Sequence, residues 1–125
     1  MSGWHLTVVA GLFALTAGCA TPISETSSRF IEAEGFVTTG SETDWPSFDA
    51  SAQGQPGWHS GYGGDLRIVR LLSGQVRSRT IPIRYIAHSQ INSEYKIRFR
   101  LMRVGEDPDL YVVCAEVDGI GFDCN

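Results

Sequence analysis

Few residues beyond the first 29 positions have the types and spacing that catalysis requires. His59 and His88 are the only histidines in that part of the chain, and no acid–base or nucleophile set accompanies them. The stretch GWHSG at 57–61 lacks the Gly-x-Ser-x-Gly spacing of a nucleophile elbow, and no helix is expected to follow it. We therefore expect a protein that is not an enzyme.

Metal and phosphate chemistry finds no support in the spacing of the residues either. His59, His88 and Asp65 would form a metal site only if the fold brought them together, and they are not spaced as metal ligands. GYGG at 61–64 precedes a strand rather than a helix, so it does not match a phosphate-binding loop. GEDPDLY at 105–111 lacks the spacing of a Ca²⁺ loop and indicates an acidic hairpin turn. We expect no metal and no cofactor, an exposed His59 in its Gly-rich loop, and a structural role for His88.

An aromatic loop supplies the first candidate binding residues. The segment 38–64 is rich in Gly and Ser, and its aromatic residues are Trp45, Phe48, Trp58 and Tyr62. Long loops in compact domains are often functional. Rings in such a loop could stack on a sugar or anchor a protein partner, since Trp and Tyr are enriched at the centres of interfaces. The alternative is a lid whose buried rings enlarge a small core.

Positive charge is concentrated in one part of the chain. Nine of the ten Lys and Arg residues lie between Arg67 and Arg103, whereas the chain from Val104 onwards has six acids and no base. The predicted basic face consists of Arg67, Arg84, Lys96, Arg98 and Arg100. Arginine suits bidentate contacts with carboxylates or phosphates, such as those of acidic proteins, peptidoglycan or lipid A. The alternative is pairing with the chain's own acids, which contributes little per pair.

The N-terminal residues indicate export. Residues 6–17 form an apolar run that is too short for a membrane-spanning helix of about 20 residues and fits the central region of a signal peptide. The run leads into Ala17-Gly18-Cys19, which resembles the lipobox of bacterial lipoproteins. In that family the leader is removed before the cysteine, and the cysteine carries the lipid.

The lipobox resemblance implies a domain organisation and a location. Residues 1–18 would be the signal peptide, Cys19 the lipidated residue, 19–29 a polar tether and 30–125 the folded domain. The residue after Cys19 is Ala20 rather than Asp. This resembles the pattern of Gram-negative lipoproteins that are sorted to the outer membrane. We expect a lipid-anchored protein of the outer membrane that faces the periplasm, with the membrane as a partner through the lipid on Cys19.

The two remaining cysteines, Cys114 and Cys124, are expected to form a disulfide. An exported domain lies in a compartment where disulfides form and persist. The chain-entropy estimate for a loop this short is about 3 kcal/mol of stabilisation. No histidine or second cysteine cluster lies near them with the spacing of metal ligands.

The elements that must position these residues are strands. Five segments show the alternation or apolar runs of strands, and no helical pattern with caps follows the leader. The expected strands are 29–37, 65–76, 79–88, 94–104 and 110–117. The apolar phase breaks at Ile68-Val69, which predicts a bulge or a strand buried on both faces. Pro82 predicts an edge or a bulge in the third strand, and Ser73-Gly74 predicts a turn in the second.

Five short strands are best accommodated by a small closed or nearly closed barrel, because closure removes edges and buries one alternating face. The stretches LRIVRLLSGQV, TIPIRY, YKIRFRLMR and LYVVCAEVDGIGF, within 65–122, look like exported bacterial domains with the OB-like barrel of the netrin module. That resemblance implies an all-β, five-stranded OB-like barrel. Such barrels serve as inhibitors, adaptors and ligand binders, so the fold by itself implies no function.

The expected function is a non-enzymatic binding module that recognises an envelope protein or a glycan through the aromatic loop and the basic face. The alternatives are a structural accessory subunit of an envelope complex and a periplasmic inhibitor of a lytic enzyme. The net charge of −4 provides no general attraction for nucleic acid, so no nucleic-acid partner is expected.

Overall fold

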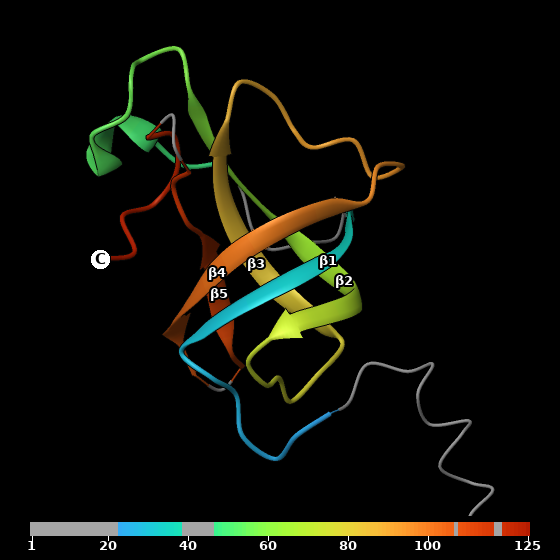
Figure 1. Ribbon diagram of the computed structural model, residues 1–125. Helices are drawn as coiled ribbons and strands as arrows, with labels where there is room; N and C mark the ends of the chain where they lie inside the picture. Colours follow the sequence, from blue (N-terminus) through green and yellow to red (C-terminus); the bar gives the residue numbers. More distant parts are fainter. Residues whose placement is uncertain (1–22, 39–46, 107, 117–118) are drawn as a thin grey trace, which may run out of the picture.

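The five strands form a closed barrel (Figure 1). The computed structural model describes residues 23–38, 47–106, 108–116 and 119–125. Its elements are β1 (Phe30–Thr38), the 3-10 helix η2 (Ala50–Gln53), β2 (Ser60–Ser73), β3 (Thr80–Ala87), β4 (Ile97–Gly105) and β5 (Leu110–Val113). The strand order is β1-β2-β3-β5-β4, with β3 and β5 parallel and the other pairs antiparallel. The predicted all-β, five-stranded barrel is confirmed, and this order is compatible with an OB-like fold.

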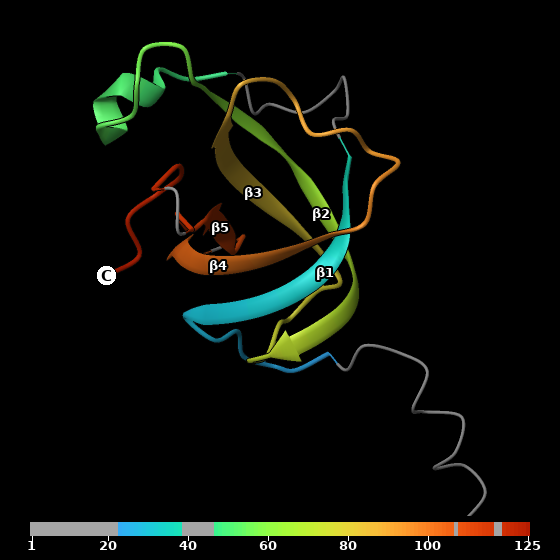
Figure 2. The same ribbon diagram turned by 45° about the horizontal axis from the view of Figure 1, so that its top comes forward.

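The alternating faces predicted from the sequence do form the core. Inward positions of all five strands are buried, and the largest fully buried side chains include Tyr85, Tyr111, Leu66, Ile83 and Leu101. Figure 2 shows β1 and β4 crossing one side of the barrel, with β2 and β3 across from them. Every strand contributes one apolar face to the barrel interior. A second, smaller buried cluster consists of Val112, Cys114 and Cys124, with Met102 and Phe122 packed against it.

A bulge bends β2 around β1. Ile68 pairs with Gly35 and Arg70 pairs with Glu34, so Val69 is the extra residue between two successive pairs. This confirms the break predicted at Ile68-Val69. At this bend the two backbones come so close that a Cβ on Gly35 would collide with the carbonyl oxygen of Arg67. Position 35 therefore requires glycine, because the backbone of Arg67 leaves no room for a side chain there.

Four predicted strand limits are wrong. β2 begins at Ser60 rather than 65, so residues 60–64 belong to the strand and not to the loop, and it ends at Ser73 rather than 76. Gly61 is buried in this strand because the Phe48 ring packs where its side chain would be. β4 begins at Ile97 rather than 94, because Asn92 caps a turn there by accepting from the Glu94 and Tyr95 N–H groups. β5 ends at Val113.

The shortness of β5 has a local cause. After Val113, Cys114 forms a parallel bridge with Phe122, and Ala115 N donates to Phe122 O at 2.8 Å. The Cys114–Cys124 disulfide, with an S–S distance of 2.01 Å, joins the same two segments and confirms the predicted pairing. The chain is therefore drawn away from β4 toward its own C-terminus. Pro82 faces Asp65 of β2 and lies outside the β3–β5 pairs, in agreement with the predicted edge position.

The described part of the predicted tether lies against the barrel. Ser24 N donates to Val76 O at 2.8 Å, and Ser28 N donates to Gln75 O at 2.9 Å. Tyr111 Oη donates to the Ser28 carbonyl at 3.0 Å from the core side. Residues 23–29 are thus held at the barrel end formed by the β2–β3 connection (Figure 1). Cys19 and the rest of residues 1–22 lie outside the described residues.

A half-buried carboxylate, that of Asp109, strengthens this attachment. Asp109 accepts from Arg77 Nη2 at 2.7 Å and from Ser27 Oγ at 2.5 Å. The hydrogen bond from Arg77 is the main reason why the pKa of Asp109 lies below its usual value; burial opposes this effect, and Ser27 adds to it. Because the unfolded chain binds the proton more tightly, this carboxylate stabilises the fold above about pH 4, and the contribution is lost at lower pH.

Candidate binding surfaces

The structure assigns different roles to the aromatic residues of the predicted loop. Trp45 lies outside the described residues. Phe48 is half-buried, packs its ring on Gly61 and lies 5.8 Å from the Phe122 ring. Its backbone exchanges two hydrogen bonds with Gly61, at 2.9 and 3.0 Å. Phe48 therefore closes one end of the barrel, as the lid interpretation expects.

Trp58 has the opposite environment. It is 70% exposed, yet its ring is supported by His59 at 5.6 Å and by His88 at 5.9 Å between ring centroids. Tyr62 lies beside this group, packed on Tyr85 at 5.5 Å, with its hydroxyl 3.5 Å from the His88 carbonyl. We call Trp58, His59, His88 and Tyr62 the aromatic end. Trp58 and His59 belong to the segment 47–59. This segment and residues 23–29 lie at opposite ends of the barrel in Figures 1 and 2.

His59 is buried, so the prediction that it is exposed is wrong. Only 5% of its surface is accessible, and its ring stacks on that of His88 at 4.3 Å. Neither ring nitrogen has a hydrogen-bond partner among the described residues. The rings of Trp58 and His88 lie against that of His59, and His59 N donates to Pro56 O in the turn that precedes β2. Among the described residues, no group of three or more His, Cys, Asp or Glu is placed to hold a metal ion.

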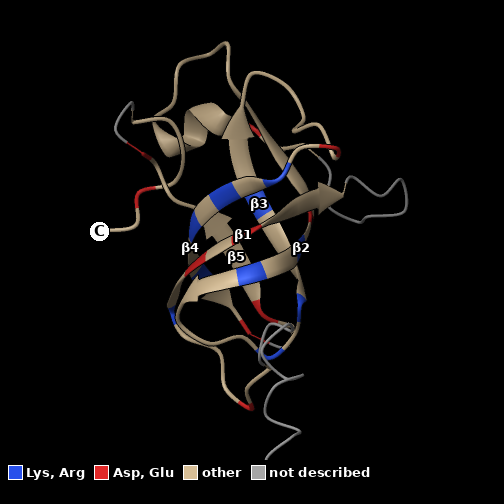
Figure 3. Ribbon diagram, turned by 45° about the vertical axis from the view of Figure 1, so that its right-hand side comes forward, with Lys and Arg blue, Asp and Glu red and all other residues tan. Residues whose placement is uncertain are grey.

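The predicted basic face is divided by the strand order. Arg84 lies on β3, which β5 separates from β4, and Arg67 lies on β2 with its guanidinium 5.0 Å from the Phe36 ring. Arg98 and Arg100 are two residues apart on the exposed face of β4, and Lys96 immediately precedes that strand. Figure 3 shows basic positions on β2 and β4, with acidic positions on β1 between them. The five cations therefore do not form one surface.

Arg98, one of these five cations, pairs with an acid of β1, and so does Arg70, which lies outside the predicted face. Arg98 forms an ion pair with Glu32 at 2.7 Å, and Arg70 forms one with Glu34 at 3.3 Å. The Arg98 pKa is raised, first by its hydrogen bond to Glu32. Arg100 instead stacks on the Phe30 ring at 5.7 Å. Pairing with the chain's own acids thus applies to part of the predicted face, and such exposed pairs contribute little to stability.

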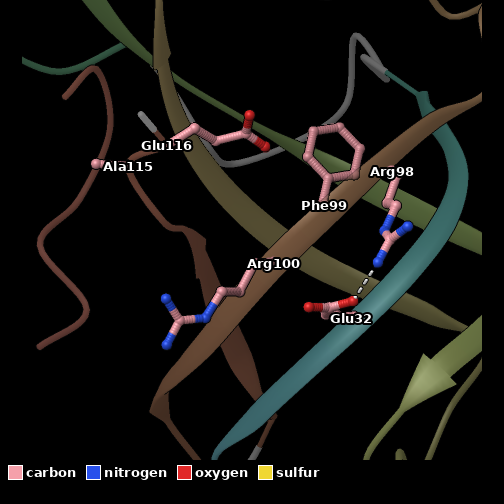
Figure 4. Close-up of a pocket in the computed structure, with 6 residues that line it drawn as sticks. All are labelled: Glu32, Arg98, Phe99, Arg100, Ala115 and Glu116. Atoms are coloured by element: carbon pink, nitrogen blue, oxygen red, sulfur yellow. Dashed lines mark hydrogen bonds and ion pairs between the residues drawn. The ribbon is translucent and has the colours of Figure 1, made fainter. Parts of the chain in front are cut away.

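A groove of about 690 Å³ lies beside β4. Its lining residues are Glu32, Arg98, Phe99, Arg100, Ala115 and Glu116. Figure 4 shows Glu116 extending from the C-terminal segment toward β4, with Arg98 bonded to Glu32 on the β1 side. The sequence interpretation includes Arg98 and Arg100 but misses the groove. It places residues 115 and 116 in a longer last strand, which would have paired along β4 and filled this space.

The two surfaces differ in what they can bind. The aromatic end presents an exposed indole beside the buried ring of His59 and the exposed ring of His88, which suits stacking against a sugar face or insertion into a protein pocket. The groove combines guanidiniums with an apolar floor.

Within the described residues, no helix is long and apolar enough to cross a bilayer. Comparison of the chain with family models, curated proteins and solved structures finds no match.

Proposed function

We propose that this protein is a non-enzymatic binding module of the bacterial envelope, anchored in the outer membrane by a lipid on Cys19 and facing the periplasm. Its ligand is an envelope protein or a glycan. The observation that carries the proposal is Trp58, which is 70% exposed although its ring lies against those of His59 and His88. A large apolar ring that remains in water in the free protein gains most from burial against a partner.

The position of the aromatic end supports this assignment. Residues 23–29 are bonded to the opposite end of the barrel, so a lipid on Cys19 would hold that end near the membrane. From Cys19 to Ser24 the chain can reach at most about 18 Å. A short connection of this kind directs Trp58 away from the bilayer, toward envelope components.

The lipid is tested by the mass of the mature chain. We expect an N-terminus at Cys19 that carries a thioether-linked diacylglycerol and an amide-linked acyl chain. A thioether to the cysteine survives mild base, which removes only the ester-linked chains. Recovery of the unmodified chain from the envelope, with residues 1–18 still present, would contradict the anchor.

The binding surface is tested by Trp58→Ala. The intact lipoprotein is crosslinked in its native envelope and purified, and the captured proteins and glycans are identified. We expect the variant to retain its melting temperature and to lose about tenfold or more of the captured partner, because truncation of a central Trp commonly costs at least 2 kcal/mol of binding. One stoichiometric protein would indicate a complex subunit or an inhibitor, and captured glycan would indicate a wall-binding module.

Tyr95→Ala is the matched control. Tyr95 is also an exposed aromatic residue, at 64% of its surface, but it belongs to the β3–β4 connection and not to the aromatic end. Capture should be unchanged in this variant. Equal capture by the wild-type protein and the Trp58→Ala variant would exclude the aromatic end as the binding surface.

A further inference from the structure

One edge of β4 is only partly covered. On one side β1 pairs with β4 from Met102 to Ile97. On the other side β5 pairs only with Leu101–Gly105, and the last contact is the bond from Cys114 N to Arg100 O at 2.9 Å. Within the part of the chain that the structure describes, nothing pairs with β4 on this side before Arg100.

The open side presents backbone groups to the groove. In a strand, the N–H and C=O of one residue point to the same side, and successive residues alternate between sides. Since Arg100 O faces Cys114, the N–H and C=O of Arg98 face the same side. This is the side on which the groove lies, bounded opposite by Ala115 and Glu116. Among the described residues, one wall of the groove is therefore a strand edge without a pairing partner.

We propose that this edge accepts an extended acidic segment of a partner protein, which adds as a strand beside Ile97–Arg100 and lies in the groove. Strand addition supplies main-chain hydrogen bonds, and alternate side chains then meet the two faces of the sheet. On the inner face the segment would contact Phe99. On the outer face its carboxylates would lie across from Arg98 and Arg100. This is a second surface, distinct from the aromatic end.

Charge determines which occupant fits. Glu32 is already paired with Arg98 at 2.7 Å, whereas Arg100 forms no ion pair among the described residues and stacks only on Phe30. Lys96 extends the row of cations in the same alternating phase. An acidic strand would place opposite charges across the new pair, which favours pairing.

A second copy of this chain does not fit the same edge. Pairing two β4 edges would place Arg98 and Arg100 of one molecule beside those of the other. Like charges directly opposite each other destabilise a strand pair. The cations on this edge thus disfavour self-association and select a partner segment of opposite charge.

Peptide titration tests the proposal. The probe is a capped heptapeptide in which Glu alternates with Val, titrated into the full chain, purified from membranes in detergent, at low ionic strength. The matched probe has Lys in place of Glu. We expect only the acidic peptide to bind, and we expect it to slow hydrogen exchange of the Arg98 amide. N-methylation of the backbone amides that face β4 should weaken binding about tenfold.

Variants of the groove sharpen the test. Arg100→Gln should weaken binding of the acidic peptide about fivefold, and Glu116→Gln should strengthen it about twofold by removing a repelling charge. Arg84→Gln is the control, because β5 separates Arg84 from the groove. Any one of three results would overturn the proposal. The acidic and basic peptides bind equally well, N-methylation leaves binding of the acidic peptide unchanged, or Arg84→Gln weakens binding as much as Arg100→Gln does. Trp58→Ala should leave peptide binding unchanged. A failure of the peptide test therefore counts against the β4 edge alone, and a failure of the capture test counts against the aromatic end alone.

Discussion

Gly35→Ala is expected to lower the free energy of unfolding by about 3 kcal/mol, the upper end of the usual cost of overpacking. The added Cβ would overlap the carbonyl oxygen of Arg67, which is a backbone atom and cannot move without shifting β2. The Val69 bulge is what brings the two backbones this close. Urea denaturation followed by intrinsic fluorescence gives the change in midpoint and in slope.

Gly57→Ala is the matched control for this prediction. A Cβ at position 57 meets no atom within 4 Å, so the same substitution adds no collision there. Its effect should stay within about 0.5 kcal/mol, as for most surface changes. If both variants unfold at the wild-type urea concentration, β1 and β2 are not packed at the bulge as described.

Replacing both disulfide cysteines, Cys114→Ala with Cys124→Ala, should also cost about 3 kcal/mol. The two residues are ten apart in sequence, and opening a loop of this size restores conformational entropy to the unfolded chain. Chemical denaturation of the double variant and of the reduced wild-type protein measures the cost. Both should be destabilised to a similar extent.

The same double variant also tests the groove. The disulfide holds the C-terminal segment beside Cys114, and Ala115 and Glu116 follow directly as the far wall of the groove. We expect the acidic heptapeptide to bind the double variant more weakly, even under conditions where the barrel remains folded. A loss of stability below 1 kcal/mol would mean that the bridge to Phe122 holds this segment without the disulfide.

The candidate residues were predictable by type and not by arrangement. Side-chain chemistry singled out Trp58 as a candidate binding ring and Arg98 and Arg100 as candidate anion-binding groups, and these roles stay predictions. It did not show that Phe48 would be a lid, because that depends on the ring meeting Gly61 of β2. It also placed Arg84 with Arg98, although β5 lies between their strands.

From the sequence alone followed the number of strands, the buried faces of β3 and β4, the break in apolar phase at Ile68-Val69 and the pairing of Cys114 with Cys124. These follow from local rules, because alternation has a period of two residues and only two cysteines lie in the folded part. The tertiary structure alone decided the burial of His59, the pairing of Arg98 with Glu32 and the open edge of β4. The physical reason is that strand order and register bring together residues far apart in the chain, as in the Arg98–Glu32 pair, 66 residues apart.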